Sequence, residues 1–111
     1  MPFLAPRVAN LGLKNQRVQA EGPLDVYGEM RRFFFDTALS AARPVFACLR
    51  ELIPMENILF GTDYPFAPDA HVKTTVEGLA NAVPDARERT AIERDNALTL
   101  FPRLRQSIAI S

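Results

Sequence analysis

The chain has 111 residues, the length of at most one domain, and with 48% hydrophobic and 23% charged residues it has the composition of a soluble globular protein. Thirteen basic residues balance thirteen acidic ones, which argues against broad electrostatic binding to nucleic acid or to an anionic membrane. No apolar run is long enough to cross a bilayer, the start lacks the features of a signal peptide, and the single cysteine, Cys48, fits a reducing compartment, so we expect a cytoplasmic protein.

Two short helices are expected first. Apolar residues at helical spacing predict one helix within residues 1–18, which Pro6 would limit or kink. After a loop, Asp25 is placed to cap a second helix that ends at Arg31 or Arg32.

The next segments predict two buried parallel strands joined by a helix. Residues 33–35 and 58–60 show no polar alternation, which is typical of strands covered on both faces. Between them, an apolar stripe predicts a helix over residues 41–53 with Pro44 in its first turn. The whole run has about the length of a βαβ unit, so its crossover should be right-handed.

The remaining sequence is predicted to be largely helical. Residues 71–82 carry an apolar face, and Pro84-Asp85 starts another helix on which Ile92 faces inward. Asp95-Asn96 is interpreted as a break that caps a last short helix, residues 97–101. The C-terminal tail shows no clear pattern.

One carboxylate is singled out by its position. Gly61 lets the backbone turn or approach a neighbour closely after the second strand, Pro65 ends that strand, and Asp63 lies between them. Parallel α/β folds bind ligands beyond the carboxyl ends of their strands, so Asp63 is the best candidate for a functional residue. Its plainer interpretation is a turn or cap aspartate. Asp36, at the end of the first strand, is predicted to make a structural hydrogen bond to a neighbouring strand or loop.

Other notable residues are given structural roles. Cys48 and the aromatic run at 33–35 are predicted to lie in the core, since no basic residues alternate with the aromatics. His71 is expected at the surface or at a helix cap, and Asn96 at a cap. A solvated helix face is predicted for Arg87, Glu88, Arg89, Glu93 and Arg94.

Two strands are too few for an independent sheet, so the sequence looks like a piece of a larger parallel α/β structure. Gly61-Thr62-Asp63-Tyr64-Pro65-Phe66 resembles the last-strand motif of the amidohydrolase-related family, in the branch that contains aminocarboxymuconate-semialdehyde decarboxylase. Residues 34–38 resemble the seventh strand of that family, and residues 95–101 resemble its closing Asn-Ala-x-x-Leu-Phe helix. Residues 2–7 are similar to the segment that follows the family's His-x-Gly-Gly motif.

The resemblance implies an α/β chain that forms the C-terminal portion, about the last two βα units, of a (β/α)8 barrel, with residues 1–111 as a partial domain. It implies a divalent metal, usually zinc, and places Asp63 on the aspartate that binds the metal or lies beside its activated water. Arg7 matches an arginine that holds the substrate carboxylate from a neighbouring subunit, which implies a homodimer. The family's other metal-ligating histidines have no counterpart here, so we expect the isolated chain to bind no metal and to be inactive.

Two functions of different classes follow from the sequence. The first is a fragment of a metal-dependent hydrolase or decarboxylase that acts on a small carboxylic acid; the motifs choose neither the reaction nor the substrate. The second is a non-catalytic small α/β protein that associates through exposed strand edges. This second function predicts a folded oligomer with no metal dependence.

Overall fold

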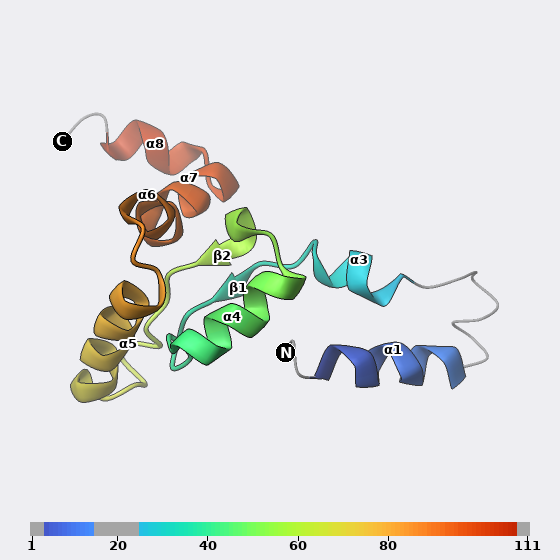
Figure 1. The fold of residues 1–111 in the computed structure, drawn as a ribbon. Helices are drawn as coiled ribbons and strands as arrows, with labels where there is room; N and C mark the ends of the chain where they lie inside the picture. The colour runs from blue at the N-terminus through green and yellow to red at the C-terminus, as the bar shows by residue number, and fades with distance from the viewer. Residues whose placement is uncertain (1–3, 15–24, 109–111) are drawn as a thin grey trace.

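Residues 4–14 and 25–108 are described by a computed structural model, in which helices pack around a small parallel sheet (Figure 1). The shape is elongated, with principal extents of 52 × 32 × 28 Å. Helices α1 and α3 lie at one end of the molecule, and α5 to α8 lie at the other (Figure 1). Among the described helices, none combines the length and the apolarity that a bilayer-crossing segment needs.

The centre is the predicted strand–helix–strand unit. Strands β1 (Phe35–Asp36) and β2 (Ile58–Leu59) pair in parallel, with Phe35 opposite Ile58, and helix α4 (Arg43–Leu52) connects them. Pro44 lies in the first turn of α4, where its missing N–H costs no hydrogen bond. The parallel βαβ unit is therefore confirmed, and the hand of its crossover stays a prediction.

Helix α4 turns one face to the core. Phe46, Leu49 and Ile53 are buried there and pack with Ile58, which is fully buried in β2. Cys48 is exposed, so its predicted place in the core is wrong. The reason is geometric: Cys48 lies outside the arc of the helix that these apolar residues define.

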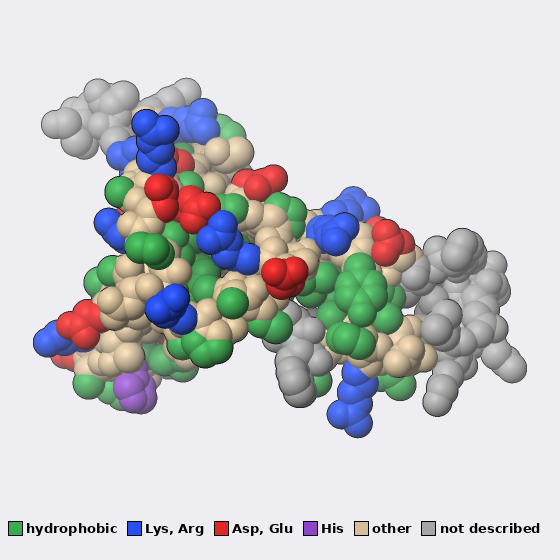
Figure 2. Space-filling model, in the orientation of Figure 1, with side chains coloured by type: hydrophobic (Ala, Val, Ile, Leu, Met, Phe, Trp, Pro, Cys, Tyr) green, Lys and Arg blue, Asp and Glu red, His purple; other side chains and the backbone are tan. Residues whose placement is uncertain are grey.

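The aromatic run at 33–35 was predicted to be core, which is wrong for Phe33 and Phe34, whereas Phe35 packs against the core cluster. Phe33 is 62% exposed and Phe34 is 44% exposed, and β1 begins only at Phe35, which is partly buried. No described strand pairs with the outer edge of β1, and the described residues leave these two rings largely open. They border an apolar groove of about 430 Å³ whose other walls include Val8 and Met30. Figure 2 shows hydrophobic side chains gathered over α3 on this part of the surface.

The N-terminal helices were predicted correctly in type. Helix α1 (Ala5–Lys14) begins one residue before Pro6, so the proline occupies the first turn and does not kink the helix. Helix α3 (Val26–Met30) is capped by Asp25, whose Oδ1 accepts a hydrogen bond of 2.8 Å from the Gly28 N–H. Ala5 is buried in the same core cluster as Val26 and Met30.

Helices follow β2 to the end of the described chain. Four of them are α5 (Asp69–Ala82), α6 (Ala86–Thr90), α7 (Asn96–Leu100) and α8 (Arg103–Ile108). The expected break at Asp95-Asn96 is wrong, because a π-helical turn (Ala91–Asp95) joins α6 to α7 without interruption. Asn96 is buried rather than a cap, and Ile92 faces inward as predicted.

This helical run is attached to the edge of β2 that faces away from β1. The Phe60 N–H donates to the Ile92 carbonyl oxygen at 3.0 Å, and the Asn96 side-chain amide donates to the Ile58 carbonyl oxygen at 2.8 Å. Both backbone groups belong to a strand edge that would otherwise lack partners. The C-terminal helices thus close this part of the β2 edge.

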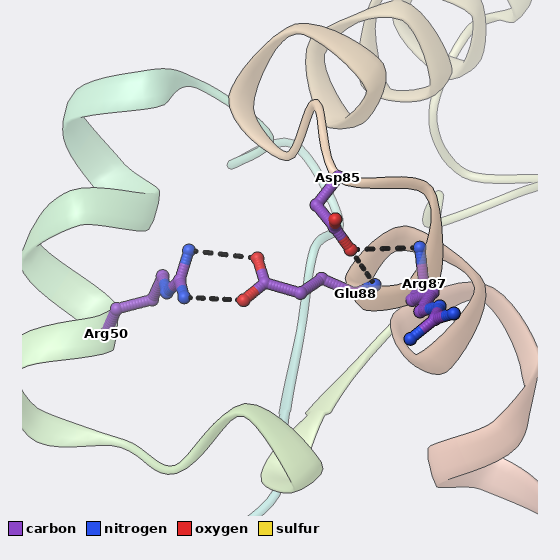
Figure 3. A network of polar contacts seen from close by, with 4 residues as sticks. All are labelled: Arg50, Asp85, Arg87 and Glu88. Carbon is purple, nitrogen blue, oxygen red and sulfur yellow. Dashed lines mark hydrogen bonds and ion pairs between the residues drawn. The ribbon is translucent and has the colours of Figure 1, made fainter.

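A two-pronged ion pair joins α4 to α6 (Figure 3). The Arg50 guanidinium donates to both carboxylate oxygens of Glu88, at 2.9 and 3.2 Å, and the two side chains remain 46% and 37% exposed. Asp85 caps α6 by accepting from the N–H groups of Arg87 and Glu88 (Figure 3). Glu88 was predicted to lie on a solvated helix face, and its cross-helix partner Arg50 is a contact that this prediction did not include.

Candidate functional site

Asp63 lies beyond the carboxyl end of β2, as the sequence predicts. Its carboxylate is exposed, and its backbone has a φ of 61°, in the left-handed region that residues other than glycine enter at a cost. The Asp63 carbonyl oxygen accepts a hydrogen bond of 2.8 Å from the Ala67 N–H, which closes the turn before α5. The turn also contains a cis peptide bond between Tyr64 and Pro65.

The turn is held to β1 by its first residue, Gly61. The Thr37 hydroxyl donates to the Gly61 carbonyl oxygen at 3.0 Å and accepts from the Gly61 N–H at 3.1 Å. A Cβ at position 61 would lie 3.1 Å from Cβ and 3.2 Å from Cγ of Asp36, closer than most real contacts of this kind. Of the two roles predicted for Gly61, close approach to a neighbour is therefore the one it serves.

Asp36 has the structural role that was expected of it. Its Oδ1 accepts a hydrogen bond of 2.8 Å from the Ala38 N–H, within the loop that follows β1. The same loop contains Leu39, the other non-glycine residue with a positive φ in the described chain, at 55°. Both left-handed residues thus lie in loops at the carboxyl end of the sheet. Residues with strained backbone conformations cluster at functional sites, which agrees with a candidate site at this end.

Arg7 and Asp63 lie on separate elements of the chain. Arg7 is exposed on α1, which lies beside α3, whereas Asp63 lies in the turn that leads into α5, and α1 and α5 lie on opposite sides of the molecule (Figure 1). Sequence reasoning assigned Arg7 to a substrate shared with a neighbouring subunit, so this separation does not decide its role. That role stays a prediction.

His71 lies at the surface, as predicted, and Figure 2 shows it over α5. It borders a hollow of about 320 Å³ together with Leu39 and Thr74. Within residues 4–14 and 25–108, no three His, Cys, Asp or Glu side chains come close enough to hold a metal ion together. Asp63 offers one hard oxygen ligand, so this part of the chain does not complete a metal centre by itself.

Thr37 is the site residue that sequence reasoning missed. It is 2% exposed and lies directly after β1. A threonine at a strand end is unremarkable in sequence, and its partner, Gly61, follows 24 positions later. Only the pairing of the two parallel strands brings them together.

The fold and the site define a parallel α/β chain with a carboxylate at the carboxyl end of its sheet. The family model described as Amidohydrolase matches residues 13–103, so the chain belongs to the amidohydrolase family. This confirms the resemblance seen in the strand and helix motifs.

Three curated relatives extend the comparison. The 6-methylsalicylic acid decarboxylase acuB of Aspergillus aculeatus is 38% identical, over 98% of this chain and 34% of that protein. The 6-methylsalicylic acid decarboxylase of Penicillium expansum is 32% identical, over 95% of this chain and 32% of that protein. Decarboxylase yanB of Aspergillus niger is 31% identical, over 93% of this chain and 29% of that protein. The chain thus spans about a third of the length of these relatives. No solved structure gives a significant match.

Proposed function

We propose that residues 1–111 supply the last two strand–helix units of a (β/α)8 barrel enzyme that decarboxylates a small carboxylic acid with the help of a divalent metal. Hydrolysis is the other reaction of the family, and decarboxylation is favoured because all three relatives are named decarboxylases. The observation that carries the proposal is the exposed Asp63 carboxylate beyond a parallel strand of a chain in the amidohydrolase family.

Asp63 is the proposed catalytic residue and one metal ligand. Its turn leaves the sheet in a fixed direction, since Gly61 is bound to Thr37 just before it. A bound metal, usually zinc in this family, would act as a Lewis acid toward the substrate. Its remaining ligands would come from outside the described residues, which bring together no three His, Cys, Asp or Glu side chains that could hold a metal ion.

Arg7 is the proposed substrate-binding residue. Its guanidinium is exposed on α1 and could grip a substrate carboxylate with two hydrogen bonds. The family resemblance assigns this role to an arginine of a neighbouring subunit, so the shared site would be formed in a homodimer, with Arg7 and Asp63 coming from different subunits.

The test is a fusion in which this chain replaces the matching third of acuB. We expect the fusion to release CO2 from 6-methylsalicylic acid, to lose that activity with a chelator and to regain it with zinc. Asp63→Asn should lower kcat by roughly 10²- to 10⁴-fold, because the neutral amide is a weaker metal ligand than the carboxylate and cannot take a proton from a metal-bound water. Asp69→Asn, an exposed aspartate at the start of α5, is the matched control and should change little. An active fusion that tolerates Asp63→Asn would refute the assigned role.

A second candidate function, a non-catalytic interaction module, is favoured by one observation. Phe33 and Phe34 are exposed beside an apolar groove, and no described strand pairs with the outer edge of β1. Sedimentation of the 111-residue chain with chelator present tests it. A folded oligomer that dissociates when both rings are replaced by serine would support this function, and a monomer or an aggregate would count against it.

A further inference from the structure

We infer that Thr37 is a positioning residue for Asp63: its hydroxyl fixes the Gly61 peptide and so sets the direction in which the Asp63 carboxylate leaves the sheet. The inference rests on the proposed function of Asp63. In the proposed function, Thr37 contacts neither the metal nor the substrate. It acts on Asp63 only through the backbone of Gly61.

The first support is the chemistry of the contact. The Thr37 side chain is almost wholly buried, and its one hydroxyl bonds the peptide groups on both sides of Gly61, donating to the Gly61 carbonyl oxygen and accepting from the Gly61 N–H. A buried hydroxyl that made no hydrogen bonds would destabilise the fold, and so would buried Gly61 backbone groups without partners. The two hydrogen bonds therefore hold Thr37 and Gly61 together. Valine has the same shape but can neither donate nor accept, whereas serine can do both.

The second support is the place of Gly61 along the chain. The ladder between β1 and β2 continues through the Thr37 N–H, which donates to the Leu59 carbonyl oxygen at 3.1 Å. After Gly61, the hydrogen bonds recorded for the described turn are local ones, from Tyr64 to Thr62 and from Ala67 to Asp63. Gly61 is therefore the last attachment of the turn to the sheet before Asp63.

The third support is the conformation of Asp63 itself. A positive φ in a residue with a side chain is kept only when the surrounding contacts determine it. On the upstream side, those contacts are the Thr37 hydroxyl and the Asp36 side chain, which lies close against Gly61. Removing the hydroxyl frees the Gly61 peptide to rotate and should let the Asp63 backbone relax.

Hydrogen exchange measured by mass spectrometry on the full 111-residue chain tests the structural half. Thr37→Val should speed exchange in a peptide covering residues 60–64 by roughly tenfold, with peptides of α4 and α5 unchanged, and Thr37→Ser should match the unaltered chain. Thr75→Val is the matched control, since Thr75 is 3% exposed and donates only to the His71 carbonyl oxygen in its own helix. Unchanged exchange at 60–64, or faster exchange everywhere, would overturn a local positioning role.

Kinetics of the acuB fusion test the functional half. Thr37→Val should lower kcat by roughly 10- to 100-fold with KM within about twofold, because the reacting group is misplaced while substrate binding is kept. Thr37→Ser should restore kcat, and Thr75→Val should leave it unchanged. If Asp63→Asn abolishes activity and Thr37→Val does not, the inference fails and the proposed function stands. If Asp63→Asn has no effect, the proposed function fails, and the positioning role falls with it.

Discussion

The side-chain amide of Asn96 donates a hydrogen bond of 2.8 Å to the carbonyl oxygen of Ile58, in the strand that leads to Asp63. The same nitrogen donates to the Met55 carbonyl oxygen at 2.9 Å, and Asn96 is only 8% exposed. One side chain therefore satisfies two backbone acceptors around the start of β2. It links the C-terminal helices to the strand that positions the candidate site.

Replacing Asn96 by alanine should destabilise the chain by about 1–3 kcal/mol, because the buried Ile58 carbonyl oxygen loses this donor, whereas the Met55 carbonyl oxygen keeps the Ile58 N–H. Asn81→Ala is the matched control: Asn81 is exposed on α5 and its replacement should change stability by less than about 0.5 kcal/mol. Urea denaturation followed by circular dichroism measures both. Equal midpoints for the two variants would show that the Asn96 contacts contribute nothing.

Asn96 also shows why part of the fold was outside the reach of the sequence. Asn after Asp is typical of a helix start, and local pattern therefore predicted a cap. The partner that decides its role, Ile58, lies 38 positions earlier. The helices α4 and α5 were predictable because their apolar periodicity is local, and the strand at Ile58 because its apolar residues are consecutive.

The site divides in the same way. Asp63 was found because a buried strand followed by Gly and Pro marks a strand end within a few residues. Thr37 was missed because its function depends on a contact across the parallel pair. Phe33 and Phe34 were wrongly predicted to be buried. A hydrophobic run indicates that a segment is suited to burial, but it does not say which neighbouring element would bury it.

Gly78 is required by a close approach between α5 and the loop before α4. A Cβ at position 78 would overlap the Ala41 carbonyl oxygen and lie 3.1 Å from its carbon, and that backbone cannot swing away as a side chain can. Gly78→Ala should therefore destabilise by about 1–3 kcal/mol, despite a gain in helix propensity of about 1 kcal/mol. Thermal unfolding measures this. Ala80→Gly, at an exposed position of the same helix, tests propensity alone; a stabilised Gly78→Ala would refute the steric argument.

The Arg50–Glu88 pair should stabilise the packing of α4 against α6 only modestly. Both side chains are more than a third exposed, so solvent screening limits a double-mutant coupling energy to about 0.5–1 kcal/mol even with two-pronged geometry (Figure 3). Arg50→Gln and Glu88→Gln, alone and together, give that coupling, which should fall as salt is raised. The Arg32–Glu29 pair is more exposed and lies within one turn, so its coupling should be smaller, about 0.3 kcal/mol. A salt-independent coupling, or a larger one for Arg32–Glu29, would contradict this account.

Arg7 gives the sharpest test of a site shared between subunits. In the acuB fusion, Arg7→Gln should raise KM at least about tenfold with a smaller change in kcat, because the substrate carboxylate loses a charged two-pronged partner. Arg103→Gln, an exposed arginine of α8, is the control. If Arg7 and Asp63 act from different subunits, mixing the Arg7→Gln and Asp63→Asn fusions should restore about a quarter of the activity, since half of the dimers formed would contain one intact site of two. Activity that stays at the level of the separate variants would place the two residues in the same subunit's site or remove Arg7 from it.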